Sequence, residues 1–402
     1  MNTENLDLIY NSSYIINQLN KSKNIDKQFT FGSESELISL IKSHAPNLDT
    51  KLLEAYSDIR LKIAEHMRLD SIVFLFGNGS SLYAGSQETN AFSISEYTKQ
   101  AKYKTLKNTI EKINQFLGIE DQLNALLIVS AYYHLINDRK KRVAEQLIND
   151  VKENLISNFV NSIDYRKLDI HEIMLRKLRS FECLSRTSIY TLNYDLAFEY
   201  SFDKLGIEYK DGFSGFVNRL FDPKNLDGKG IPSLIKIHGS VNWLSNDNEI
   251  KEFQPQFEDG KVKIPKDTPV LIYPTSHKLY QTYTSPYSEL MRHMLDELES
   301  NRNVVIVLGY KYGDEHINEI LHKALKNPHN IFYFFAYSPD EANVFLSKII
   351  NIADTMPNVN YFEGKVLADF SNFVKYMLPA TPEKTDQEKV IELLGKVLKN
   401  NG

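Results

Sequence analysis

The chain has 402 residues, and at roughly 150 residues per domain this length predicts two to three folded units, or one large domain with a sizeable insertion. Its 47 basic and 52 acidic residues leave a net charge of −5, which excludes an overall basic field for gripping nucleic acid or anionic lipid. Hydrophobic residues make up 42% of the chain, enough to bury a large core. The single cysteine, Cys183, excludes an internal disulfide and a zinc site built from several thiolates, and we expect it to be a small buried residue.

The sequence carries no signal for secretion or membrane insertion. Its first residues, MNTENLDLIY, lack the basic stretch and apolar core of a secretory signal. Apolar runs such as 72–76 and 304–308 are far shorter than the about 20 residues that a membrane helix needs. We therefore expect a cytoplasmic protein.

Short apolar runs rich in Val, Ile, Phe and Tyr predict buried strands. These runs are 72–76, 188–192, 234–237, 270–273, 304–308 and 331–336. Both faces of the runs are apolar and helical segments lie between several of them, which indicates a mostly parallel sheet. The predicted fold class is α/β, a Rossmann-like doubly wound sheet with N-terminal helices and a large helical insertion.

Helical periodicity precedes, interrupts and follows these strands. A capping box at 33–36 and a helix over 52–67 come first, apolar residues at spacings of three and four fill 99–182, and 387–398 is amphipathic. The domain boundaries that this pattern predicts are 1–68 for an N-terminal helical segment, 69–98 with 183–345 for the sheet domain, 99–182 for a helical insertion, and 346–402 for a mainly helical C-terminal segment.

A turn of glycine and hydroxyl residues, GNGSS at 77–81, follows the first predicted strand directly. Glycines let backbone N–H groups approach an anion and serine hydroxyls add donors, so the turn fits a phosphate. Leu82 stands where the full dinucleotide fingerprint has its third glycine. An ordinary tight turn between strand and helix is therefore an equally good interpretation.

Polar side chains also end two later strands, in TLNYD at 191–195 and HGS at 238–240. Ligands of open α/β sheets bind at the carboxyl ends of the strands, so Asn193, Asp195 and His238 should converge with the glycine turn on one site. Taken singly, His238 is more readily explained as a satisfied buried histidine and Asn193 as a helix cap. Taken together at neighbouring strand ends, they favour a binding site.

A second cluster, Asp314, Glu315, His316 and His322, invites a metal interpretation. The two histidines are six residues apart, which is a poor helical spacing for two ligands of one ion. We favour a solvated helix start, with the acids near the positive end of the helix dipole, and predict no metal site.

The ordered set of motifs resembles the sirtuin-like (silent information regulator type) domains, over roughly residues 70–345. The counterparts are GNGSS at 77–81, TLNYD at 191–195, KIHGSVNW at 236–243 and VLGYKYGDEHIN at 307–318. The last of these is similar to the sequence of a branch found in bacterial antiphage defence systems, whose stand-alone members work beside HerA-type ATPases. The resemblance implies that 69–98 and 183–345 form a Rossmann NAD-binding domain.

Departures from the deacylase sirtuins are equally informative. Their zinc ribbon needs four cysteines, the Pro-Asp-Phe-Arg that follows their glycine loop is replaced here by GSQE at 85–88, and Leu192 stands in place of the usual Gln. A protein deacylase is therefore disfavoured, and no zinc is expected.

The resemblance instead implies an NAD⁺ hydrolase that releases nicotinamide and ADP-ribose, with a cyclised ADP-ribose left open as a minor product. His238 would bind the ribose hydroxyls and act as base, Asn193 would orient the attacking water, and Asp195 would hold the nicotinamide carboxamide. NAD is the substrate. The residues implied to bind it are Gly77, Asn78, Gly79, Ser80, Ser81, Thr191 and Gly239, with Gly309, Tyr310 and Tyr337 on the adenosine side.

The resemblance also implies a role and partners. The protein would be the NAD-depleting effector of an antiviral, abortive-infection type defence system. It would be a homo-oligomer that is activated by assembly with a HerA-type hexameric ATPase. No membrane partner is expected, and direct binding of nucleic acid is unsupported. The alternative is a non-hydrolytic sensor of NAD or an ADP-ribose derivative, which the retention of Asn193, Asp195 and His238 disfavours. A sirtuin-type deacylase is the third interpretation.

Overall fold

The structure is a computed structural model of the whole chain. The residues that it describes are 60–68, 71–87, 93–115, 118–216, 219–228, 230–246, 249–263, 269–271, 285–337, 343–364 and 368–379. Residues 60–66 are helical, within the helix expected over 52–67. The expected capping box at 33–36 and the amphipathic stretch at 387–398 lie outside the described residues.

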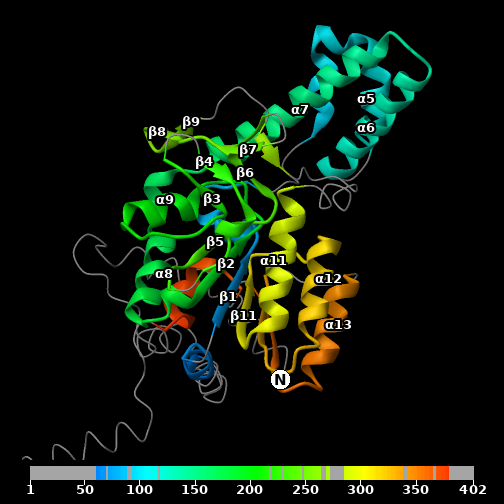
Figure 1. Cartoon of the computed structure of the whole chain (residues 1–402). Coiled ribbons are helices and arrows are strands. Elements are labelled where there is room, and N and C mark those ends of the chain that lie inside the picture. Colours follow the sequence, from blue (N-terminus) through cyan, green and yellow to red (C-terminus); the bar gives the residue numbers. More distant parts are fainter. Residues whose placement is uncertain are drawn as a thin grey trace, which may run out of the picture.

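A six-stranded sheet in which every neighbouring pair is parallel forms the centre of the molecule (Figure 1). Its strands are β1 (Ser71–Phe76), β2 (Thr187–Thr191), β5 (Ser233–Lys236), β11 (Asn303–Leu308), β12 (Ile331–Ala336) and β13 (Val359–Glu363). The first five lie where the sequence predicts strands. Their order across the sheet is β13-β12-β11-β1-β2-β5, so the chain leaves β1 towards one edge and later returns to its other side at β11. This is the doubly wound, Rossmann-like order, with its switch point between β1 and β11.

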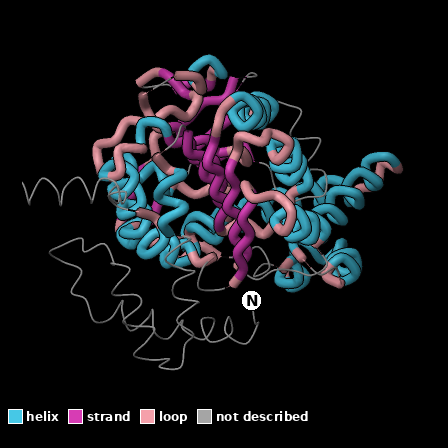
Figure 2. Tube along the Cα trace, turned by 90° about the horizontal axis from the view of Figure 1, so that it is seen from below, coloured by secondary structure: helices cyan, strands magenta, loops and turns pink. Residues whose placement is uncertain are grey.

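Helices cover both faces of this sheet, as Figure 2 shows from below. Along β1, Val73 and Leu75 point to one face and Ile72, Phe74 and Phe76 to the other, each set into its own apolar core. The first core is closed by α11 (Tyr287–Ser300), α12 (Glu315–Ala324) and α13 (Val344–Ala353). The second is closed by α8 (Asp169–Ser180), α9 (Ala197–Lys204), α14 (Phe370–Asn372) and the π-helical turn η9 (Phe373–Met377). The predicted α/β fold class is confirmed.

The chain between β1 and β2 is helical and carries a third apolar core. Its elements are η1 (Asn78–Ser80), η2 (Leu82–Ala84), η4 (Ile94–Lys99), η5 (Ala101–Leu106), α5 (Lys107–Ile113), α6 (Ile119–Leu135), α7 (Lys140–Ser162), η6 (Tyr165–Lys167), α8 and η7 (Leu184–Arg186). Helices α5 to α7 project from the body, whereas α8 packs on the central sheet (Figure 1). The range 99–182 is therefore helical, but its last helix belongs to the core of the sheet.

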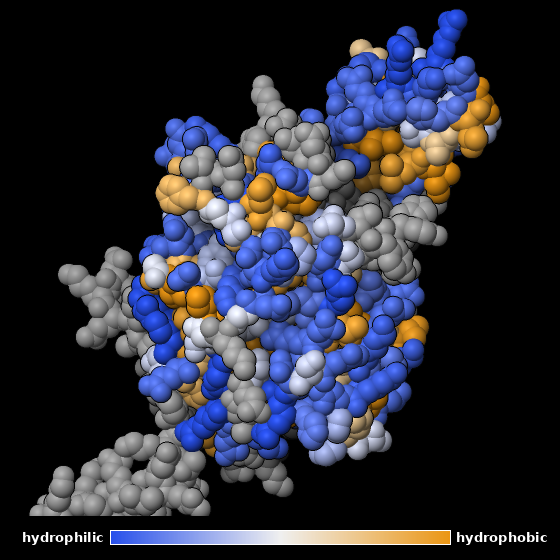
Figure 3. Space-filling model, in the orientation of Figure 1, coloured by the Kyte–Doolittle hydropathy of each residue, from blue (hydrophilic) through white to orange (hydrophobic). Residues whose placement is uncertain are grey.

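One surface of the projecting helices is apolar and exposed. It consists of Ile128, Tyr132, Leu135 and Ile136, here called the α6 stripe, in which the Leu135 side chain is 85% exposed. Figure 3 shows apolar atoms gathered on this projecting part. The residues of the α6 stripe follow one another at spacings of four, three and one, which places them on one side of the helix.

A second, antiparallel sheet has the order β10-β6-β7-β4-β3. Its strands are β3 (Phe213–Ser214), β4 (Arg219–Phe221), β6 (Gly239–Asn246), β7 (Glu249–Glu252) and β10 (Pro269–Leu271). The turn η8 (Pro223–Asn225) follows β4, and β8 (Gln256–Glu258) and β9 (Lys261–Lys263) form a separate antiparallel pair. The prediction that 270–273 joins the parallel sheet was wrong, because β10 pairs antiparallel with β6. No helix lies among the described residues between β6 and β10, and a parallel pairing needs such a crossover.

The central sheet extends beyond residue 345, into the range expected to be mainly helical. β13 pairs with β12 and forms the edge of the sheet. Only its first residue, Val359, is fully buried, and the other four are partly exposed. Among the described residues, no helix combines the length and apolar character needed to cross a membrane.

Candidate functional site

The glycine turn, residues 77–81, packs backbone to backbone against the turn that follows β11. Gly79 N donates to Gly309 O at 3.0 Å, and Gly77 N donates to Leu308 O at 3.3 Å. A Cβ on Gly77 would lie 2.6 Å from Gly309 O, and one on Gly79 would lie 2.6 Å from Gly309 Cα. The glycines therefore bring the ends of β1 and β11 into direct contact at the switch point.

The N–H groups of Gly77, Gly79, Ser80 and Ser81 in this turn are engaged within the protein. Ser80 N donates to Gly77 O and Ser81 N to Asn78 O, each at 3.0 Å, in addition to the two bonds to the β11 end. The Ser80 hydroxyl also donates to Gly77 O, at 2.9 Å. The close contact with Gly309 thus explains the glycine spacing without a phosphate, and phosphate binding by this turn stays a prediction.

Asn193 points from the end of β2 into the glycine turn. Its side-chain nitrogen donates to Ser80 Oγ at 3.0 Å and to Ser81 Oγ at 3.1 Å, and its backbone N–H donates to Thr191 Oγ1 at 3.1 Å. The residue is 7% exposed, and its Oδ1 atom is buried without a hydrogen-bond partner among the described residues. An unsatisfied buried acceptor costs about 1–3 kcal/mol, which a donor on a bound ligand would recover. Asn193 is therefore a polar group held in place at the switch point and lacking one donor.

Asp195 is buried and takes part in local structure. Its Oδ1 atom accepts a hydrogen bond from Ala197 N at 3.0 Å, directly before α9. Lys236 Nζ, from the end of β5, binds the backbone carbonyls of Tyr194 and Asp195 and lies 2.8 Å from Glu199 Oε1. The loop that carries Asn193 and Asp195 is thereby tied to the neighbouring strand.

His238 follows β5 and contacts a residue that the sequence did not place in the site. The loops after β2 and β5 run side by side, since Ile237 N donates to Thr191 O at 3.0 Å. His238 Nε2 lies 2.9 Å from His316 Nε2, and the two side chains are 4% and 6% exposed. The expectation of a solvated helix start holds for Glu315, which is exposed, but is wrong for His316. Ile317, Ile320 and Leu321 are buried beside it, so this face of α12 turns towards the protein.

Other predicted site residues have partners of their own. Asn78 accepts from Ser86 Oγ at 2.6 Å and donates to Gln87 O at 2.9 Å, so it stabilises the loop after β1. Tyr310 is buried, and its hydroxyl accepts from Asp314 N at 2.9 Å. Burial raises the pKa of Tyr310 well above its ordinary value.

The remaining predicted positions lie at the strand ends. Gly239 begins β6 with φ of 85°, directly after His238. Tyr337 is half exposed at the end of β12. The structure thus brings Asn193, the glycine turn and Gly309 together and pairs His238 with His316, all at the carboxyl edge of the central sheet.

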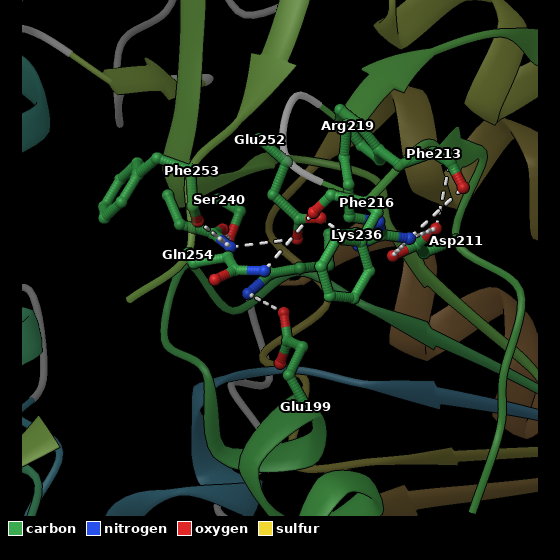
Figure 4. Close-up of polar contacts among 11 residues, drawn as sticks. Glu199, Asp211, Phe213, Phe216, Arg219, Lys236, Ser240, Glu252, Phe253 and Gln254 are labelled. Atoms are coloured by element: carbon green, nitrogen blue, oxygen red, sulfur yellow. Dashed lines mark hydrogen bonds and ion pairs between the residues drawn. The ribbon is translucent and has the colours of Figure 1, made fainter. Parts of the chain in front are cut away.

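A buried cluster of charged side chains supports the strand that follows His238 (Figure 4). Arg219 on β4 donates to both carboxylate oxygens of Asp211, at 2.8 and 2.9 Å, and also binds Glu252 on β7. Asn242 on β6 donates to the other oxygen of Glu252 at 2.9 Å. Burial raises the pKa of Glu252 to about 7, and the nearby Asp211 charge adds to the effect while Arg219 opposes it. The sequence analysis did not identify these residues.

This cluster predicts a pH dependence of stability. Because the pKa of Glu252 is about 7 when folded and ordinarily 4.5, the folded state binds the proton more tightly between these values. Stability should therefore fall as pH rises from 4.5 to 7, by roughly 1–3 kcal/mol from this group. Burial also raises the pKa values of Asp211 and Glu199, which act in the same direction.

Glu252→Gln should flatten this pH dependence, which thermal unfolding between pH 5 and 8 measures. Glu249→Gln, at an exposed position of the same strand, is the matched control and should keep the slope of the wild type. Equal slopes for the two variants would show that Glu252 is not the titrating group.

No group of three or more His, Cys, Asp or Glu side chains among the described residues is placed to hold a metal ion. Cys183 is fully buried as expected, and burial raises its pKa to about 12.

Comparison with known proteins gives one family match. One solved structure, described as a complex of a SIR2 homologue with NAD, aligns over 78% of this chain and 93% of its own, with 12% identity and a TM-score of 0.38. Another, described as the structural basis for sirtuin substrate affinity, aligns over 78% of this chain and 94% of its own, with 11% identity and a TM-score of 0.36. No curated protein matches the chain. Residues 187–352, which include Asn193, Asp195, His238 and His316 but not the glycine turn, match the SIR2-like domain family.

Proposed function

We propose that the protein is an NAD⁺ hydrolase that releases nicotinamide and leaves ADP-ribose. The observation that carries the proposal is Asn193, whose buried Oδ1 has no donor among the described residues while its nitrogen is held by Ser80 and Ser81. The match of residues 187–352 to the SIR2-like domain family supports NAD as the ligand. The position at the switch point of a doubly wound sheet, where nucleotides bind in this fold, supports the same assignment.

Cleavage of the bond between nicotinamide and ribose requires few catalytic groups. Nicotinamide in NAD is already a cationic leaving group, so cleavage of its bond to ribose requires no general acid. The protein has to stabilise the developing ribosyl cation and present a water molecule to it. Asn193 Oδ1, as a fixed acceptor, would orient that water, and His238 would bind the ribose hydroxyls and act as base.

The other contacts of the substrate are assigned by position. The Ser81 hydroxyl accepts from Asn193 and donates to no side chain or backbone group in the part of the chain that the structure describes, so it is the donor of the glycine turn that we assign to the diphosphate. Asp195 would hold the carboxamide through the carboxylate oxygen that does not bind Ala197 N. Gly309 and Tyr337 would lie on the adenosine side. Tyr310 would act there through its ring, since its hydroxyl binds Asp314 N.

An enzyme that depletes a shared cofactor has to be inactive in healthy cells, which supports control by assembly. We propose that the protein is the NAD-depleting effector of a bacterial antiphage defence system, a homo-oligomer that is activated by assembly with a separate HerA-type hexameric ATPase. The α6 stripe supports this proposal, because contiguous exposed apolar side chains are typical of protein interfaces.

The test is to incubate the purified protein with NAD, alone and with a HerA-type ATPase, and to quantify nicotinamide by chromatography. We expect release in at least one of these states, without any acylated substrate. Binding of NAD without release would instead identify a sensor. Release only in the presence of an acyl-lysine peptide would identify a deacylase.

A further inference from the structure

The contact between His316 and His238 joins two segments that are far apart in the chain. His238 follows β5, whereas His316 is the second residue of α12, the helix that comes after β11. Their Nε2 atoms are 2.9 Å apart and their ring planes are tilted by 42°. Both side chains are buried, so the contact is made out of bulk water. His238 therefore shares one of its ring nitrogens with a second titratable side chain.

A hydrogen bond between two imidazole nitrogens requires one hydrogen between them. Neutral imidazole has one N–H donor and one acceptor nitrogen, so one ring has to carry its hydrogen on Nε2 and the other has to offer a lone pair there. Two Nε2 hydrogens would face each other as donors, and two charged rings at this distance would repel each other. The proton position on His238 is thus coupled to that on His316, and the same contact limits rotation of the His238 ring.

We propose that His316 is a positioning residue that fixes the ring orientation and the proton position of His238. The inference rests on the proposed function, because it takes His238 as the base of the reaction. A histidine base works only when its accepting nitrogen carries a lone pair aimed at the proton it removes, and the bond made by the other nitrogen decides which one that is. His316 acts through His238 and does not contact the substrate.

Kinetics of three variants test this role in the assembly state that releases nicotinamide. His316→Ala removes the ring, and kcat should fall roughly 10- to 100-fold with KM changed less than about threefold. His316→Gln places an amide near the position of Nε2, so it should restore kcat to within about fivefold of the wild type. His322→Gln, at an exposed position of the same helix, should have wild-type kcat. Wild-type kcat in His316→Ala, or an equal loss in the Ala and Gln variants, would overturn the proposal.

A spectroscopic readout without substrate separates this inference from the proposed function. In protein with ¹⁵N-labelled histidines, the His238 signals, assigned by their loss in His238→Asn, should report one tautomer. They should change to a tautomer mixture in His316→Ala, if that variant folds, and stay unchanged in His322→Gln. A mixture of tautomers in the wild type itself would overturn the proposal that His316 fixes the proton position of His238. If the wild type releases no nicotinamide but shows a single His238 tautomer that becomes a mixture in His316→Ala, the proposed function fails and the positioning role of His316 stands.

Discussion

Replacing Asn193 by alanine is expected to lower nicotinamide release at least about 100-fold while the protein stays folded. The substitution removes the one buried side-chain acceptor at the switch point that lacks a donor among the described residues. The Ser80 hydroxyl keeps its bond to Gly77 O, so the glycine turn retains its internal hydrogen bonds. The loss should therefore fall on kcat, as expected for a group that orients the attacking water. Nicotinamide release under saturating NAD measures it.

The control for this prediction is the loss of an amide elsewhere in the same sheet. Asn360, on the edge strand β13, donates to Phe332 O at 3.0 Å and is half-buried. Asn360→Ala should lower stability modestly and leave nicotinamide release unchanged. Near wild-type release by a folded Asn193→Ala variant would show that the water-orienting role belongs to another residue.

The strands that sequence patterns predicted well are those buried on both faces. β1, β11 and β12 are mostly continuous apolar runs because helices cover the sheet on both sides, and such runs stand out from their surroundings. β2 and β5 are buried along their whole length but have apolar residues only at their centres. β13 lacks this signal, since four of its five residues are partly exposed at the edge of the sheet. An apolar run also gives no strand direction, which is why β10 was assigned to the wrong sheet.

The same logic explains which parts of the site could be predicted. Asn193 meets the glycine turn because β1 and β2 are neighbours, and polar residues at the carboxyl ends of neighbouring parallel strands have to lie close together. His316 was missed because its role depends on the packing angle of α12. One signal was present in the sequence, since His316 lies one helical turn before the buried Ile320 and so on the same face. The Asp211, Arg219 and Glu252 cluster gave no signal, because it depends on pairing in the antiparallel sheet.

Gly309→Ala is expected to have the largest effect on stability, a loss of roughly 2–5 kcal/mol, because it combines two costs. Gly309 has a φ of 69°, in the left-handed region that alanine rarely adopts. An added Cβ would also lie 2.8 Å from Ser80 N and 3.0 Å from Gly79 C, which are backbone atoms of the glycine turn. Relief of this overlap has to separate the ends of β1 and β11. Ser80 would move with the turn, so nicotinamide release should fall as well.

Two other glycines separate these costs. Gly206 has a φ of 60° and no atom within 4 Å of an added Cβ, so Gly206→Ala should show the conformational cost alone, about 1 kcal/mol. Gly313 lies in the same loop as Gly309 with open space around it, so Gly313→Ala should change stability by less than about 0.5 kcal/mol. Urea unfolding of the three variants measures the series. If Gly309→Ala matches Gly206→Ala in both stability and nicotinamide release, the close approach of the two turns does not hold the site. The glycine spacing after β1 then requires another explanation, and phosphate binding is the first one to test.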